Sequence, residues 1–284
     1  MTRMFDRLEK SEPALAVCIL QHGPEWVEII GDVGYDVVMV DQMCTSIDWR
    51  EVHDMFRAAR QYNMTPMIRL QGSPWNGGRA DAHTASEVLR ALSIGAEVIT
   101  MSVDTAEEVA AVVGVDAGRH ERIYLGREFP RDQNWREPLI VPWLESRGAV
   151  ENIDDILRVP GLRAISLGVG DICRVVGHPS DFEHADVREV LKKIVGKARD
   201  KGIMVMASHP QRSEYKFTPV ELVRDRVHWL CEIGVSVVYA VVYGYTVYYT
   251  MQNIHETVRK GIPSGKAYPP LDIGNKTTGN IKAA

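Results

Sequence analysis

Gly34-Tyr-Asp-Val-Val-Met-Val-Asp41 is the stretch that decides the fold, because a glycine, an apolar strand and a carboxylate follow one another in it. Its apolar residues are consecutive rather than alternating, which is typical of a parallel strand covered on both faces. Gly34 stands between a helical stretch and this strand, where a helix C-cap glycine belongs. The stretch therefore predicts one unit of an α/β protein.

The same unit recurs on both sides of this stretch. Strands are predicted at Leu15–Leu20, Asp36–Asp41, Pro66–Leu70, Glu97–Val103, Leu139–Glu145, Ala164–Gly168, Gly202–Ala207 and Val235–Val242. Helical stretches are predicted at Trp49–Tyr62, Ala82–Ser93, Thr105–Val113, Val187–Asp200 and Pro219–Ile233. Eight strands in βα alternation favour a (β/α)8 TIM barrel over an open doubly wound sheet. A ninth apolar segment, Ile123–Phe129, is interpreted as an extra strand or loop outside the barrel.

Length and composition fit one barrel domain. We expect it to span residues 1–262 of the 284, followed by a surface arm at 263–284. A net charge of −5 gives no basic footprint for nucleic acid, and no apolar run approaches the ~18 residues that a membrane span requires. The first residues lack the apolar core of a signal peptide, and the four cysteines show no CxxC spacing. These features predict a cytoplasmic protein with free, buried thiols.

Two carboxylates follow neighbouring predicted strands. Glu145 ends Leu139-Ile-Val-Pro-Trp-Leu-Glu145, and Asp171 ends Ala164-Ile-Ser-Leu-Gly-Val-Gly-Asp171. Chemistry in TIM barrels takes place at the carboxyl ends of the strands, where these two side chains would meet. Hard cations such as Mg²⁺ and Mn²⁺ are held by one or two carboxylates together with water and substrate oxygens. The pair predicts a divalent metal site, with helix capping or a structural ion pair as the alternative.

Positive and polar groups are predicted at the same end of the barrel. Arg69 leaves its strand into a loop rich in glycine and proline, where a guanidinium is well placed to bind a carboxylate through two N–H groups. An ion pair with Asp41 is the alternative role for this arginine. The turn formed by Gly168, Val169, Gly170 and Asp171 offers backbone N–H groups for a second anionic oxygen.

The order and spacing of these residues resemble the HpcH/HpaI-type class II pyruvate aldolases, within the phosphoenolpyruvate/pyruvate barrel superfamily. The resemblance covers roughly residues 14 to 260. Its carriers are Gly34–Asp41, Thr65–Arg69, Gly95–Ile99, Leu144–Ala149 and Leu167–Asp171.

This resemblance implies a mechanism and an assembly. Glu145 and Asp171 would bind Mg²⁺ or Mn²⁺, which would chelate the carboxylate and keto oxygens of a pyruvate-like substrate. Arg69 would stabilise the enolate oxygen, and the Gly168–Asp171 backbone would receive the substrate carboxylate. The implied activity is a divalent-metal-dependent carbon–carbon lyase, an aldolase or a decarboxylase, acting on a small-molecule 2-oxo acid. The family also implies a homo-oligomer, often a hexamer, with contacts made by the region after Tyr243.

The chain departs from the family where the catalytic histidine is expected. The family carries Asp-x-Glu-His, whereas this chain has Asp41-Gln-Met-Cys44, so that Asp41 is retained and Cys44 replaces the histidine. Asp41 is a catalytic candidate that would orient Arg69, bind a metal-bound water or cap the loop. His22 and His209, both at predicted strand ends, are candidates for proton transfer, with a plain surface position as the alternative. The departure leaves two other functions open, a metal-dependent hydrolase, hydratase or isomerase, and a non-catalytic barrel that binds 2-oxo acids.

Overall fold

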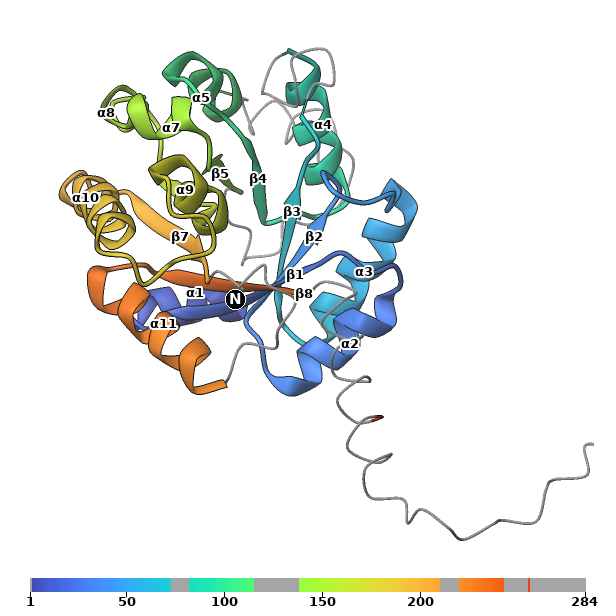
Figure 1. Ribbon diagram of the computed structural model, residues 1–284. Helices are drawn as coiled ribbons and strands as arrows, with labels where there is room; N and C mark the ends of the chain where they lie inside the picture. Colours follow the sequence, from blue (N-terminus) through green and yellow to red (C-terminus); the bar gives the residue numbers. More distant parts are fainter. Residues whose placement is uncertain (1, 73–81, 115–137, 210–219, 243–254, 256–284) are drawn as a thin grey trace, which may run out of the picture.

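Eight parallel strands close into a barrel in the computed structural model, which describes residues 2–72, 82–114, 138–209, 220–242 and 255 (Figure 1). Each strand pairs with the next along the chain, and the eighth pairs with the first, as expected for a (β/α)8 TIM barrel. The strands are β1 (Ala14–Ile19), β2 (Val37–Asp41), β3 (Thr65–Arg69), β4 (Val98–Ser102), β5 (Leu139–Leu144), β6 (Ala164–Leu167), β7 (Met204–Ser208) and β8 (Val237–Val242).

Helices cover the outside of the barrel (Figure 1). They are α1 (Arg3–Glu9), α2 (Pro24–Val33), α3 (Trp49–Gln61), α4 (Ala82–Ser93), α5 (Ala106–Val113), α7 (Arg147–Glu151), α8 (Ile153–Ile156), α9 (Val169–Val176), α10 (Ala185–Asp200) and α11 (Val220–Ile233). None of the helices in the described part of the chain is long and apolar enough to cross a membrane.

The predicted barrel is confirmed, because every predicted strand overlaps a strand of the structure. One local expectation changes. The open turn predicted after β6 is instead the start of α9, and Asp171 lies in the first turn of this helix. The segment Ile123–Phe129 and the arm at 263–284 lie outside the described residues, so the domain boundary stays a prediction.

Side chains alternate between the inside of the barrel and the layer under the helices, as the pleat of a strand requires. One buried cluster fills the interior and includes Cys18, Met39, Met67, Trp143 and Tyr239. A second cluster lies between strands and helices and includes residues of the opposite parity, such as Val40, Ile68 and Leu144. This alternation directs Asp41, Arg69 and Glu145 towards the barrel axis, because each stands two residues after an interior residue.

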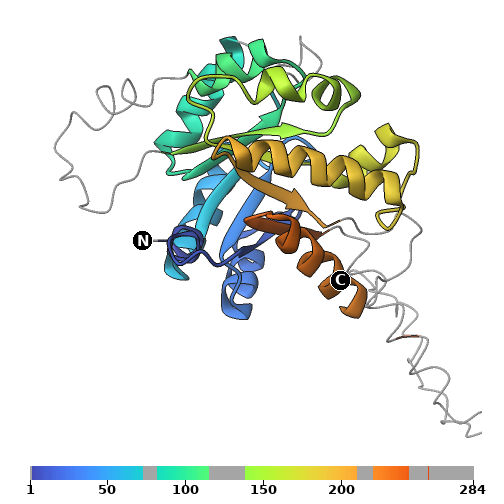
Figure 2. The same ribbon diagram turned by 90° about the vertical axis from the view of Figure 1, so that its left-hand side faces the viewer.

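Helix α1 closes the end of the barrel at which the strands begin (Figure 2). The Met4 side chain is fully buried in the interior cluster. The Met4 backbone N–H donates to Thr65 Oγ1 at 3.3 Å, and the Arg3 backbone N–H donates to the Asn63 carbonyl at 2.9 Å. The first residues therefore complete the core at the end opposite to the predicted site.

We expect Met4→Ala to lower the free energy of unfolding by about 2–4 kcal/mol, because it leaves a cavity where the barrel interior is closed. Denaturant unfolding followed by circular dichroism measures this change. Ile29→Ala serves as the matched control, since Ile29 is 56% exposed on α2 and its truncation should alter stability by less than about 0.5 kcal/mol. Equal effects of the two substitutions would contradict the closing role of α1.

Candidate active site

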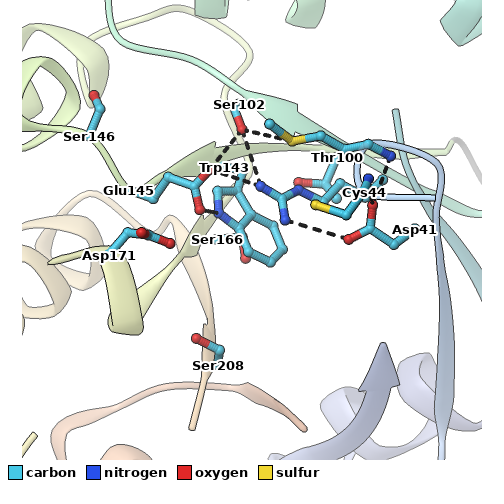
Figure 3. Close-up of polar contacts among 12 residues, drawn as sticks. Asp41, Cys44, Thr100, Ser102, Trp143, Glu145, Ser146, Ser166, Asp171 and Ser208 are labelled. Atoms are coloured by element: carbon cyan, nitrogen blue, oxygen red, sulfur yellow. Dashed lines mark hydrogen bonds and ion pairs between the residues drawn. The ribbon is translucent and has the colours of Figure 1, made fainter. Parts of the chain in front are cut away.

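Arg69 is the centre of a group of charged and aromatic side chains at the carboxyl end of the barrel. Figure 3 shows its partners Asp41, Trp143 and Glu145. Its Nη2 donates to Glu145 Oε1 at 2.8 Å, and its Nη1 lies 3.6 Å from Asp41 Oδ2. The guanidinium carbon stands 4.0 Å from the centre of the Trp143 ring. Three strands supply these residues, because Arg69 ends β3, Asp41 ends β2 and Glu145 follows β5.

The arginine is held as a buried cation. Its side chain is 10% exposed, and that of Asp41 is 3% exposed. Burial alone would lower the pKa of Arg69, but the carboxylates of Glu145 and Asp41 outweigh this effect and raise the pKa above its ordinary value. The Arg69 guanidinium therefore keeps a fixed positive charge in surroundings where charge is poorly screened by solvent.

Asp41 both faces Arg69 and holds the loop after β2. Its Oδ1 accepts the backbone N–H groups of Met43 at 2.8 Å and Cys44 at 3.0 Å. Its Oδ2 faces the arginine. Two of the three roles weighed for Asp41, capping the loop and orienting Arg69, are thus performed by different oxygens of one carboxylate.

Glu145 is fixed by contacts to both of its oxygens. Besides Arg69, Oε1 accepts a hydrogen bond from Ser102 Oγ at 3.0 Å. Oε2 accepts one from the indole Nε1 of Trp143 at 2.5 Å. Trp143 was not among the predicted site residues. The signal was its position two residues before Glu145, which places both side chains on the inward face of one strand.

Asp171 lies on a helix, whereas Glu145 follows a strand. It lies in the first turn of α9, and its carboxylate pairs with Arg174 one turn further along the helix. Its side chain is 47% exposed. Figure 3 shows Asp171 at the same end of the barrel as Glu145. Of the two predicted metal ligands, only Glu145 is tied into the group around Arg69.

The predicted carboxylate-binding backbone at Gly168–Asp171 is the N-terminus of α9. The Val169 N–H donates to Ser208 Oγ at 3.1 Å, and the Asp171 N–H donates to the Gly168 carbonyl at 3.0 Å. Gly170 lies between them in the same turn. Strand β7 thus supports this turn through the inward-facing hydroxyl of Ser208.

His22 contacts Glu51 and Ser46, which do not belong to the group around Arg69. Its ring is about half exposed, with Nδ1 2.7 Å from Glu51 Oε2 and Nε2 3.3 Å from Ser46 Oγ. These contacts tie it to the start of α3 and the loop before it.

His209 is buried and directed to the helix layer. It has the parity of Val205 and Ala207, which pack between the strands and the helices. Burial, and after it the charge of Arg226, lower the pKa of His209 to about 4, so the ring is neutral at pH 7. Its Nδ1 has no hydrogen-bond partner among the described residues. Its role in proton transfer stays a prediction.

Cys44 is exposed at the mouth of the barrel, which corrects the expectation that the thiols are buried. Cys18 and Cys173 are buried, Cys231 is partly buried, and all four thiols are free. Partial burial, and after it the charge of Asp41, raise the pKa of Cys44. A raised pKa keeps the sulfur protonated, which does not favour a nucleophilic thiolate.

Another set of potential metal ligands lies in the loop after α9 and the first turn of α10, and consists of His178, His184 and Asp186. Their ligand atoms are within 4.8 Å of one another. The Nδ1 of His184 also accepts the backbone N–H of Asp186 at 3.3 Å and so caps α10. This capping bond uses the lone pair that a metal would need, so the cluster is accounted for by the helix start.

Comparisons with known proteins agree with the fold. The family model described as HpcH/HpaI aldolase/citrate lyase matches residues 19–217. The 2-keto-3-deoxy-L-rhamnonate aldolase of Klebsiella pneumoniae subsp. pneumoniae is 28% identical over 209 residues, which cover 69% of this chain and 74% of that relative.

Two solved structures share the barrel. The HpcH/HpaI aldolase from Desulfitobacterium hafniense DCB-2 superposes with a TM-score of 0.70 at 20% identity, covering 93% of this chain and 99% of that one. Citrate synthase SbnG superposes with a TM-score of 0.67 at 20% identity, covering 90% and 97%. At these identities the structures support the fold alone, whereas the family match and the aldolase-named relatives support a lyase-type enzyme. The chain belongs to the HpcH/HpaI aldolase/citrate lyase family.

Proposed function

We propose that this protein is a divalent-metal-dependent carbon–carbon lyase that acts on a 2-oxo acid through a pyruvate enolate. The observation that carries the proposal is the buried cation of Arg69 held against Glu145 at the strand ends. A relative's name, 2-keto-3-deoxy-L-rhamnonate aldolase, also describes cleavage of a 2-oxo acid. Either an aldol cleavage or a decarboxylation fits this arrangement.

Glu145 and Asp171 are suited to hold Mg²⁺ or Mn²⁺, since both are carboxylates and such ions prefer oxygen ligands. The space beside Glu145 is kept clear by Gly168, where an added Cβ would stand 2.6 Å from Glu145 Oε2. Asp171 would exchange its exposed contact with Arg174 for the ion. When bound, the ion would supply Lewis-acid stabilisation of negative charge on the substrate.

Arg69 would bind the oxygen on which the enolate charge develops. A preorganised donor of this kind is most effective where solvent is excluded, as it is around this largely buried side chain. Asp41 would keep the guanidinium oriented, and Ser102 would keep Glu145 beside it. The N-terminal turn of α9 would receive the substrate carboxylate through the Gly170 N–H. The N–H groups of Gly168, Val169 and Asp171 already donate within the protein.

His22 and His209 remain the predicted groups for proton transfer, because Cys44 occupies the position of the family's histidine and its pKa is raised. In this structure His22 contacts Glu51 and Ser46, and His209 is directed to the helix layer, so either would have to move to reach the substrate. Cys44 is also the observation that favours a second function, a hydrolase, hydratase or isomerase on the same site. A single isomeric or hydrated product would identify that chemistry. Tight oxalate binding without turnover would identify a non-catalytic binding protein.

The homo-oligomer remains part of the proposal, although the region after Tyr243, apart from residue 255, lies outside the described residues.

Pyruvate release from a panel of 4-hydroxy-2-oxo acids and oxaloacetate tests the proposed function. We expect release with Mn²⁺ or Mg²⁺ and none with chelator. Glu145→Gln should lower kcat/KM by at least about 100-fold, because it removes a metal ligand and the partner of Arg69. Glu151→Gln is the matched control, since Glu151 is exposed on α7 and should leave the rate unchanged. Release that is indifferent to chelator and to Glu145→Gln would refute the proposal.

Gly168→Ala tests the space beside Glu145. The added Cβ would also stand 2.7 Å from Trp143 Nε1, so the glutamate and the indole cannot both keep their places. We expect the Kd for Mn²⁺, measured by calorimetry, to rise at least about tenfold. Gly196→Ala is the control, because a Cβ there meets nothing within 4 Å. A folded Gly168→Ala protein with the Mn²⁺ affinity of the native chain would show that this space does not belong to the metal site.

A further inference from the structure

Trp143 contacts both charged groups at the centre of the site. Its Nε1 donates to Glu145 Oε2, and its ring face lies under Arg69, 4.0 Å from the guanidinium carbon. One side chain thus uses its edge for the carboxylate and its face for the cation. Both contacts follow ordinary indole chemistry, because the N–H group only donates and the ring face attracts cations.

The edge contact restricts how Glu145 can turn. Oε1 is already held by Arg69 and Ser102, so the indole N–H fixes the second oxygen and with it the plane of the carboxylate. An indole has no charge and no lone pair that competes for a cation. It therefore orients the carboxylate while leaving one lone pair of Oε2 for another ligand.

The ring itself is locked from the barrel interior. Trp143 is 4% exposed, and its ring centre is 5.2 Å from that of Tyr239. The Tyr239 hydroxyl donates to the Leu167 carbonyl at 3.1 Å and lies 3.2 Å from Ser166 Oγ. Two buried rings anchored to β6 thus support the charged layer above them, so the position of Trp143 is not left to solvent or to a mobile side chain.

We propose that Trp143 is a positioning residue with two separable roles, in which its N–H orients Glu145 for the divalent ion and its ring face holds Arg69 for the substrate oxygen. The inference rests on the proposed function, because it assigns the ion to Glu145 and the substrate to Arg69. A residue with only a packing role would affect both binding events together, whereas the structure assigns each event to a different part of the indole.

Two substitutions separate the roles. Trp143→Phe keeps an aromatic face under Arg69 and removes the N–H donor. Trp143→Gln removes the ring and keeps an N–H donor three bonds from Cβ, which is the same number of bonds as in tryptophan. Trp49→Phe is the matched control, because Trp49 also lies beneath an arginine, Arg90, at 5.4 Å, but at the start of α3. Thermal melting of each variant establishes that it is folded.

The probes are Mn²⁺ alone and then oxalate added to the Mn²⁺-saturated protein, both followed by calorimetry. Trp143→Phe should raise the Kd for Mn²⁺ about tenfold or more and leave oxalate binding within about threefold of the native value. Trp143→Gln should keep the Mn²⁺ affinity within about threefold and weaken oxalate binding by roughly fivefold or more.

Native-like Mn²⁺ affinity in a folded Trp143→Phe protein would overturn this inference, and so would parallel losses of both affinities in the two variants. Failure of the native chain itself to bind Mn²⁺ would instead overturn the proposed function. The Trp49→Phe protein should match the native chain in both measurements.

Discussion

The buried charge of Arg69 is the constraint on which the rest of the site depends. A guanidinium removed from water is costly unless carboxylates and hydrogen bonds compensate for the lost solvation. Here Glu145 and Asp41 supply the charge and Trp143 supplies a ring face. Removing either carboxylate would take away one of the two anions that compensate for the lost solvation of this cation. The arrangement is therefore retained as a unit, and it presents a fixed positive charge at the end of the barrel where the strands finish.

The barrel could be predicted from the sequence because its strands are apolar on both faces and are separated by helical stretches of suitable length. The consecutive apolar residues of these strands did not reveal which side chains point towards the barrel axis. Parity supplies this information once the strand bounds are known, since Arg69 stands two residues after Met67, and Glu145 two after Trp143. The start of α9 was missed because Gly168 and Gly170 suggested an open turn, whereas the helix forms with Val169 buried against the core.

The candidate site was predicted unevenly. Arg69, Asp41 and Glu145 come together as their positions at strand ends indicated. Asp171 reaches the same end of the barrel but pairs with Arg174 on its own helix. This pair could not be predicted from the order of the strands. His22 and His209 also follow strands, yet one contacts Glu51 and the other has the parity of the helix layer. Position at a strand end therefore predicted the end of the barrel at which a residue lies. Which of these residues contact one another depended on the direction of each side chain.

Exchange of the methyl protons of pyruvate with D₂O, followed by proton NMR, tests the central claim most directly. Release of pyruvate from an enolate requires protonation of its methyl carbon, and the reverse of that step is proton loss from bound pyruvate. We expect exchange that depends on Mn²⁺ and that falls at least about 100-fold in Arg69→Lys, whose single ammonium cannot replace the planar guanidinium. Arg90→Lys, an exposed arginine over Trp49, should leave the exchange rate unchanged. Bound pyruvate that exchanges no protons, or exchange indifferent to Arg69, would contradict this claim.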